Sequence, residues 1–173
     1  MAIRKILTEG DPALRVKCAP VAAVTPGIIR LLDDMVDTMR EAQGVGLAGP
    51  QVGVVRRVIV VETEPGTVYK LINPEIIASS GEQEGNEGCL SVPGESGCVR
   101  RPMKVTVRAT DVEGKTTTIE AEGFLARAFC HEIDHLDGIL YVDKALYMNE
   151  PETDEAEKTP ASYRRHRAGA LRR

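Results

Sequence analysis

Two histidines and a glutamate form an HExxH pattern, His131-Glu132-Ile133-Asp134-His135, on a segment whose apolar spacing predicts a helix. Residues four apart on an α-helix project from one face, so both imidazoles can bind the same metal ion. Glu132 lies beside that pair, where a carboxylate can take a proton from a bound water. The alternative is a pair of core histidines, but two imidazoles and a carboxylate are costly to bury without partners. The spacing therefore favours a metal site.

Such a site needs a third ligand, and the remaining histidine does not fit. His166 lies in a basic C-terminal stretch, and Tyr141 stands where the extended pattern HExxHxxGxxH requires a histidine. The ligand must then be Cys, Asp or Glu. Cys89 is the best candidate because it lies in EGCLS, before Val-Pro-Gly, in a segment predicted as strand edge or turn. One thiolate and two imidazoles leave a tetrahedral position open, as in catalytic sites; the alternative for Cys89 is a small buried hydrophobe.

A glycine-rich segment, GVGLAGPQ at 44–51, lets the backbone approach another group closely. It is a poor match to a phosphate-binding loop, because it contains no GKS or GKT and follows a predicted helix rather than a strand. A turn that merely ends that helix is the alternative. Gln51, at its end, offers an amide donor.

These residues must be positioned by a fold with helices at both ends of a β-rich region. A cap at Thr25-Pro26 predicts a helix that runs to Gly44, with an apolar stripe whose methionines are interpreted as core filling. Short β-like segments follow at 54–61, 68–72, 75–79 and 105–109, separated by turn signals that include Asn73-Pro74. The segment 111–115 predicts a hairpin into a strand at 116–121, and a second helix runs from Gly123 to Gly138.

The predicted fold class is therefore α+β, with mostly antiparallel sheets packed around a central HExxH helix and an amphipathic helix in the N-terminal half. Composition changes after Met148, where an acidic stretch precedes a basic one. We expect a catalytic metallohydrolase domain at 1–148 and a charged, flexible tail at 149–173.

Composition excludes several other classes of protein. The 173 residues are 42% hydrophobic with a net charge of -4, typical of a soluble domain. Four tyrosines, two phenylalanines and no tryptophan leave few stacking platforms, so a sequence-specific nucleic-acid reader is not expected. No apolar run is long enough for a bilayer, and the N-terminus does not resemble a secretory signal, so the expected location is the cytoplasm. The four irregularly spaced cysteines are interpreted as thiols.

Three segments, GVGLAGPQ, EGCLS and HEIDH, resemble in order and spacing the three signature motifs of the peptide deformylases. The resemblance covers roughly residues 1–148, including LTEGDPALR, LINP at 71–74 and ARAFCHEIDHLDG. It implies a metal-dependent hydrolase that removes the N-formyl group from the N-terminal formylmethionine of newly made polypeptides and releases formate. Its partners would be formylated nascent peptides.

The resemblance also implies roles for single residues. The ligands of one divalent metal ion would be Cys89, His131 and His135. Glu132 would act as general acid and base, and the Gln51 side chain and the backbone N–H of Leu90 would stabilise the oxyanion. The residues that would contact substrate are Val45, Gly46, Leu47 and Gly88. The ligand types suit Zn²⁺, Fe²⁺, Co²⁺ and Ni²⁺, and the resemblance favours Fe²⁺ as the native ion.

Some positions depart from the pattern of the family. Gly49 stands where alanine is common and Cys130 where glutamine is common, and neither change removes a ligand. Residues 94–97 read Gly-Glu-Ser-Gly where relatives usually carry an aromatic or arginine residue bordering the peptide. Glu87 and Arg101 resemble an ion pair of the family that supports the metal ligands; the alternative is two unrelated surface charges.

Two other functions compete with deformylation. HExxH with a bound water also hydrolyses peptide bonds, although the usual downstream ligand of a peptidase has no matching context here. A non-catalytic metal-binding or ribosome-associated adaptor needs neither Glu132 nor Gln51, so the presence of both argues against it. The basic end of the chain could hold the enzyme beside ribosomal phosphate; a solvated tail that aids solubility is the alternative.

Overall fold

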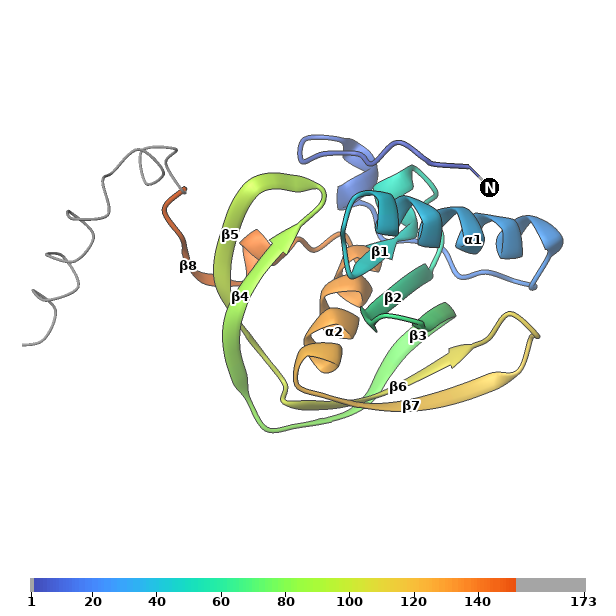
Figure 1. Ribbon diagram of the computed structural model, residues 1–173. Helices are drawn as coiled ribbons and strands as arrows, with labels where there is room; N and C mark the ends of the chain where they lie inside the picture. Colours follow the sequence, from blue (N-terminus) through green and yellow to red (C-terminus); the bar gives the residue numbers. More distant parts are fainter. Residues whose placement is uncertain (1, 152–173) are drawn as a thin grey trace, which may run out of the picture.

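The computed structural model describes residues 2–151 (Figure 1). Its helices are α1 (Pro26–Glu41) and α2 (Phe124–Leu136). Its strands are β1 (Gly46–Ala48), β2 (Val58–Glu64), β3 (Thr67–Ser80), β4 (Gln83–Cys89), β5 (Val92–Arg101), β6 (Lys104–Thr110), β7 (Thr116–Glu122) and β8 (Ala145–Met148). Short 3-10 turns cover Pro12–Arg15, Gly49–Val52 and Tyr141–Asp143.

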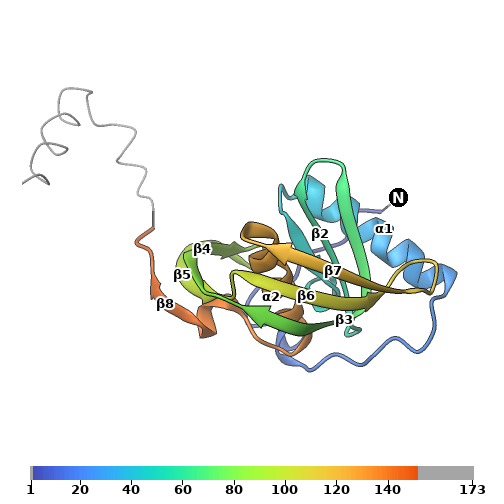
Figure 2. The same cartoon turned by 90° about the horizontal axis from the view of Figure 1, so that it is seen from below.

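Within the described part of the chain, the strands form two antiparallel sheets. One has five strands in the order β1-β2-β3-β6-β7, and the other has three in the order β4-β5-β8. Figure 2 shows β3, β6 and β7 side by side, with β8 beside β5. The predicted α+β class with antiparallel sheets is therefore confirmed. No helix between residues 2 and 151 has the length and apolar character needed to span a membrane.

Helix α1 begins at the predicted cap, where the Thr25 hydroxyl accepts a hydrogen bond from the Ile28 N–H at 3.2 Å and Pro26 takes the first helical position. It ends at Glu41, earlier than predicted, because Gln43 adopts a left-handed φ of 57°. The stripe that it buries consists of Leu31, Leu32, Met35, Val36 and Met39. The interpretation of its methionines as core residues is confirmed.

Strand β2 is buried on both faces. Side chains alternate along a strand, and Val58 and Val60 pack with α1 while Ile59 and Val61 pack with α2. The continuous apolar run 58–61 follows from this position between two helices. The predicted start of the strand at residue 54 is wrong, because β2 begins at Val58 and the backbone of Val54, Val55 and Arg57 bonds to Gly49 and Ala19.

Strand β3 is one continuous element, whereas the sequence predicted two strands separated at Asn73-Pro74. The turn signal produces a shift in strand register between Ile72 and Glu75. Asn73 has a φ of 50°, and its side-chain amide bonds to both the N–H and the C=O of Val21. The polar side chain thus anchors the N-terminal segment to the sheet without ending the strand.

Helix α2 lies between the five-stranded sheet and the β4–β5 hairpin (Figure 1). Its sheet-facing residues, including Phe129 and Ile133, pack on β2, β6 and β7, as predicted from its apolar spacing. The helix stops before Gly138, whose φ is 73° and where a Cβ atom would lie 2.8 Å from the Arg15 backbone. The predicted hairpin that joins β6 to β7 is also confirmed.

Candidate active site

The structure brings Cys89, His131 and His135 together. Cys89 is the last residue of β4, and the two histidines lie one turn apart on α2. Their ligand atoms all lie within 4.8 Å of one another, and Cys89 Sγ is 3.4 Å from His135 Nε2. A thiolate and two imidazoles are the donor set that Zn²⁺ and the late first-row divalent ions prefer, so these residues fit a catalytic metal ion.

Glu87 orients one of the two histidines. Its Oε1 lies 2.8 Å from His131 Nδ1, which leaves Nε2 of the same ring available as a ligand. Arg101 binds the Glu87 carboxylate with two nitrogens, Nε and Nη2, each at 2.9 Å. Both side chains of this pair are nearly inaccessible, so the alternative of two unrelated surface charges is wrong.

Burial and neighbouring charges shift the pKa values of these groups in different directions. Burial works to raise the pKa of Glu87, but Arg101 and His131 outweigh it and hold that pKa well below its usual range. Burial works to lower the pKa of His131, yet Cys89 and Glu87 raise it to about 10. Burial and the charge of His131 depress the pKa of His135. Since a ligand imidazole is neutral, a metal ion competes with a proton for His131.

Glu132 is buried against strand β1, beside the candidate ligands. A Cβ atom on Gly46 would lie 2.4 Å from Glu132 Oε1, so only glycine allows this close approach. Glu132 Oε2 has no hydrogen-bond partner among residues 2–151. Burial raises the pKa of Glu132 to about 7. This value suits a group that must both accept and return a proton near neutral pH.

The Gln51 amide is held in one orientation. Its Oε1 accepts a hydrogen bond from the Ala48 N–H at 2.9 Å, a contact that an amino group cannot make. Its Nε2 therefore faces the other way, 3.1 Å from Ser91 Oγ and 3.6 Å from Cys89 Sγ. Leu90 follows Cys89 at the turn between β4 and β5. Both residues predicted to supply oxyanion donors thus lie next to the cysteine.

A cavity of about 510 Å³ opens onto these groups. Its lining includes His131, Glu132, Gln51, Cys89 and Leu90, and three of the predicted substrate-binding residues, Val45, Gly46 and Gly88. The fourth, Leu47, is fully buried and packs in the core with α1. His135 is 1% exposed and lies beneath the cavity lining.

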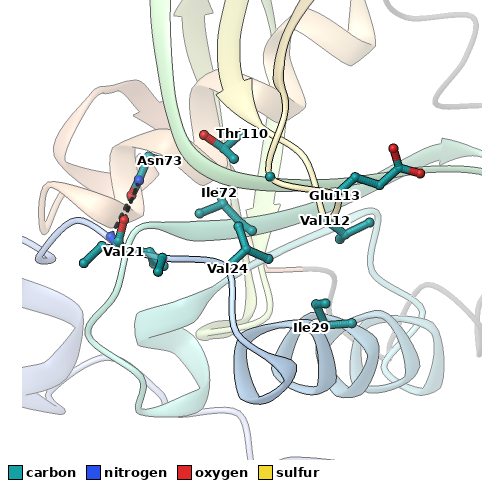
Figure 3. Close-up of a pocket in the computed structure, with 11 residues that line it drawn as sticks. Val21, Val24, Ile29, Ile72, Asn73, Thr110, Val112 and Glu113 are labelled. Carbon is teal, nitrogen blue, oxygen red and sulfur yellow. Dashed lines mark hydrogen bonds between the residues drawn. The ribbon is translucent and has the colours of Figure 1, made fainter.

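A second hollow, of about 440 Å³, lies between α1, the middle of β3 and the β6–β7 turn (Figure 3). Its walls are mainly Val21, Val24, Ile29, Ile72 and Val112, with Asn73 hydrogen-bonded to Val21 at one side. Among its lining residues there is no histidine or cysteine. The groups that can perform chemistry therefore gather in the first cavity.

Sequence reasoning missed several residues of the site. Arg127 is buried and binds Glu87, Tyr141 stacks on the His131 ring with centroids 6.1 Å apart, and Phe124 lies exposed at the cavity. Arg127 stands four residues before His131 on a predicted helix, so helical spacing alone places both on one face. The contacts of Tyr141 and Phe124 depend on the packing of distant segments and had no such signal.

The departures from the family pattern lie around the ligands without replacing them. Cys130 is buried in the core with α2, and burial raises its pKa to about 11. All four cysteines are free thiols, as interpreted from their spacing. Pro93 and Gly94 line the cavity, while Ser96 is tied to Asn149 through backbone and side-chain hydrogen bonds. Residues 94–97 therefore lie within β5, and Gly97 and Ser96 are fastened to the end of β8 and to the residue that follows it.

Known proteins are similar to this chain in both sequence and fold. A family model described as polypeptide deformylase matches residues 3–151. The peptide deformylase of Halothermothrix orenii is 55% identical over 151 residues, which are 87% of this chain and 96% of that one. The crystal structure of the Thermotoga maritima enzyme has a TM-score of 0.82 at 34% identity, over 85% of this chain and all of that one. A Legionella pneumophila peptide deformylase has a TM-score of 0.80 at 43% identity, over 96% and 98%.

An α+β fold that sets an HExxH helix against a cysteine on a neighbouring strand defines a metal-dependent hydrolase. More narrowly, the chain belongs to the peptide deformylase family. It is a hydrolase that removes the N-formyl group from formylmethionine at the start of nascent polypeptides.

Proposed function

We propose that Cys89, His131 and His135 hold one divalent metal ion and that Glu132 is the general acid and base of deformylation. The observation that carries this proposal is the convergence of three ligand atoms within 4.8 Å beside a buried carboxylate, one oxygen of which has no partner in the described part of the chain. When bound, the ion would polarise the formyl carbonyl and lower the pKa of a bound water. The remaining steps belong to side chains of this chain.

Glu132 would move the proton. Its unpartnered Oε2 can accept a proton from the attacking water, whose oxygen joins the formyl carbon. The C–N bond of the formamide then breaks, and Glu132 returns the proton to the departing α-amine. Formate and a free N-terminus result. Because burial raises the pKa of Glu132 to about 7, the carboxylate binds and releases this proton at little cost.

Gln51 and Leu90 would stabilise the negative charge on the formyl oxygen. The Gln51 amino group is already directed to the side of Cys89, because Ala48 fixes the carbonyl end of the amide. A donor that is preorganised in this way favours the transition state without reorganising during the reaction. The Leu90 N–H would be the second donor, supplied by the turn that follows the cysteine.

The substrate would occupy the 510 Å³ cavity. Val45, Gly46 and Gly88 border it and would contact the first residue of the peptide, whereas Leu47 would support β1 from the core. Phe124 and Val45 are 56% and 40% exposed, so both are accessible to the peptide beyond its first residue. We infer further that α2 is the central element of a catalytic domain at 1–148, with α1 as its outer amphipathic helix.

We propose Fe²⁺ as the native ion and the cytoplasm as the location of the reaction. The donor set accepts Fe²⁺, and a ferrous ion beside a thiolate is sensitive to oxygen. Activity of the Fe²⁺ form should decay in air together with oxidation of Cys89, while the Ni²⁺ form stays active. Fe²⁺ enzyme that remains unchanged through prolonged aeration would argue for another native ion.

The enzyme would encounter formylated nascent peptides at the ribosome. The predicted tail at 149–173 falls almost wholly outside the described residues, which end at 151. Its last stretch, from Lys158, contains six basic and no acidic residues, which favours contact with phosphate. Deleting 149–173 should leave hydrolysis of a short formyl peptide unchanged, and weaker, less salt-sensitive ribosome binding after the deletion would support a contact between the tail and ribosomal phosphate. Identical binding curves across a salt series would instead support a tail that only aids solubility.

The experiment that tests the proposed roles is a formate-release assay on a formyl-Met peptide with anaerobically purified, metal-analysed enzyme. One equivalent of metal and stoichiometric release of formate and free amine are expected. Cleavage of internal peptide bonds without formate would support the peptidase alternative. One bound metal without either reaction would support the adaptor.

A further inference from the structure

Glu87 has two arginine partners, and one of them is shared with another carboxylate. Arg101 binds both Glu87 oxygens, but its Nη1 also lies 2.6 Å from Asp134 Oδ2. Its positive charge is therefore shared between two acids, of which Asp134 also pairs with Lys144. Glu87 is only 7% exposed, and a buried carboxylate is stable only when its charge is balanced. Arg127, whose Nη1 lies 2.6 Å from Glu87 Oε2, adds a cation that among residues 2–151 pairs with Glu87 alone.

Arg127 and His131 approach the same carboxylate from one helix. They are one turn apart on α2, so their side chains leave the same face. His131 Nδ1 contacts Oε1 of Glu87, while Arg127 Nη1 contacts Oε2. The same nitrogen also donates to the Val99 and Gly85 carbonyls, at 2.9 and 3.3 Å, which fixes it between β4 and β5.

We propose that Arg127 is a positioning residue: by occupying Oε2 it keeps Oε1 of Glu87 on His131 and thereby holds the ring with Nε2 facing the metal. The inference rests on the proposed metal site. Without Arg127, Oε2 of Glu87 keeps only its contact with Arg101 Nε, so the carboxylate loses its unshared cation and is held less firmly against His131. Outer partners of a ligating histidine typically change metal affinity by about 10- to 100-fold when they are removed.

Two simpler roles for Arg127 predict different results. A residue that only fastens the β4–β5 hairpin would alter stability without a specific dependence on Glu87. A residue that contacts substrate would raise KM and leave metal release unchanged. Arg127 lines the cavity, and its Nη2 has no hydrogen-bond partner among the described residues, so the second role requires a direct test.

The test is a double-mutant cycle on the rate at which Ni²⁺-loaded enzyme releases its metal to a chelator. Arg127→Met and Glu87→Gln should each speed release by about 10- to 100-fold. Their combination should be no more than about threefold faster than the faster single variant, because Arg127 acts through Glu87. Arg127→Lys should stay near the wild-type rate, since one ammonium has three N–H donors for the three acceptors that Nη1 now contacts.

The matched control is Arg100→Met. Arg100 is the neighbour of Arg101 on β5 and forms an exposed ion pair with Glu84 on the same hairpin. It should release metal at the wild-type rate. If Arg127→Met does not fold, Arg127→Gln takes its place in the cycle with the same expectations. Thermal unfolding of the metal-free variants separates changes in fold stability from changes at the metal.

Three results would overturn the inference alone: additive effects of the two substitutions on the logarithm of the rate, unchanged release in Arg127→Met, or release from Arg127→Lys as fast as from Arg127→Met. A raised KM with unchanged release would assign Arg127 to the substrate instead. If the wild type fails to bind one equivalent of Ni²⁺, the proposed metal site falls and this inference falls with it.

Discussion

Helices α1 and α2 pack against the same β-sheet, yet they differ in the polar side chains that they bury. The inner face of α1 consists of leucine, methionine and valine side chains, which pack on Val58 and Val60. The second helix buries an apolar face against Ile59 and Val61 and, on another face, places Arg127, His131, Glu132 and His135 out of solvent. Helix α1 also buries Asp34 and Thr38, which bind the N-terminal segment at Ala2 and Arg4, but none of its residues lines the catalytic cavity. Helix α2 combines its contribution to stability with the candidate catalytic groups.

The polar surface of α2 is stable because its charges are balanced by the β4–β5 hairpin. Glu87 forms ion pairs with Arg101 and Arg127 and contacts His131. Asp134 forms ion pairs with Arg101 and Lys144. Breaking such a buried pair from one side leaves an uncompensated charge, which is more destabilising than the pair is stabilising. The difference between the helices is that the catalytic groups of α2 are held by charge partners on a separate element, whereas the buried polar residues of α1, Asp34 and Thr38, only fasten the N-terminal segment.

The largest effect is expected on activity, from Glu132→Gln on α2. The amide keeps the shape of the side chain but cannot accept the proton, so turnover should fall by about 10²- to 10⁴-fold. Metal content and thermal stability should stay near those of the wild type. Formate release from a formyl-Met peptide measures the loss; wild-type turnover would rule out Glu132 as the base.

The opposite result, a loss of stability without a loss of activity, is expected for a substitution on α1. Leu32 is 0% exposed in the core beside the sheet, so Leu32→Ala should lower the free energy of unfolding by about 2–5 kcal/mol. The folded fraction should keep the wild-type kcat, because no α1 residue lines the catalytic cavity. Urea unfolding and formate release on the same sample measure both quantities. A fall in kcat at urea concentrations below the unfolding transition would show that α1 also affects catalysis. Stability and activity would then not be divided between the two helices.

A smaller effect is expected from a substitution on β1, which contacts both helices. Gly46→Ala places a Cβ atom 2.4 Å from Glu132 Oε1, so the carboxylate must move. Displacement of a reacting group by about 1 Å typically costs about 10²-fold in rate. The loss should appear in kcat more than in metal content. If Gly46→Ala retains full kcat, the close packing of Glu132 on β1 has no role in its catalytic position.

The same contrast explains how much of the protein was predictable from sequence. Helix α1, the β6–β7 hairpin and the HExxH helix follow from local spacing and caps, and these elements are present. The continuity of β3 through Asn73 was not predictable, because it depends on hydrogen bonds to Val21, 52 residues away. The burial of Arg127 had only its helical spacing as a signal, since its acceptor Glu87 lies 40 residues earlier in the chain.

The central claim is that a cysteine on β4 completes a metal site on α2, and metal analysis of Cys89→Ala tests it most directly. The variant should be purified anaerobically beside the wild type and assayed for bound ion per chain. Since Cys89 is only half-buried and lies at the end of its strand, the variant should stay folded. The account predicts one ion per wild-type chain and loss of stoichiometric metal in the variant. Full metal retention by folded Cys89→Ala would contradict it.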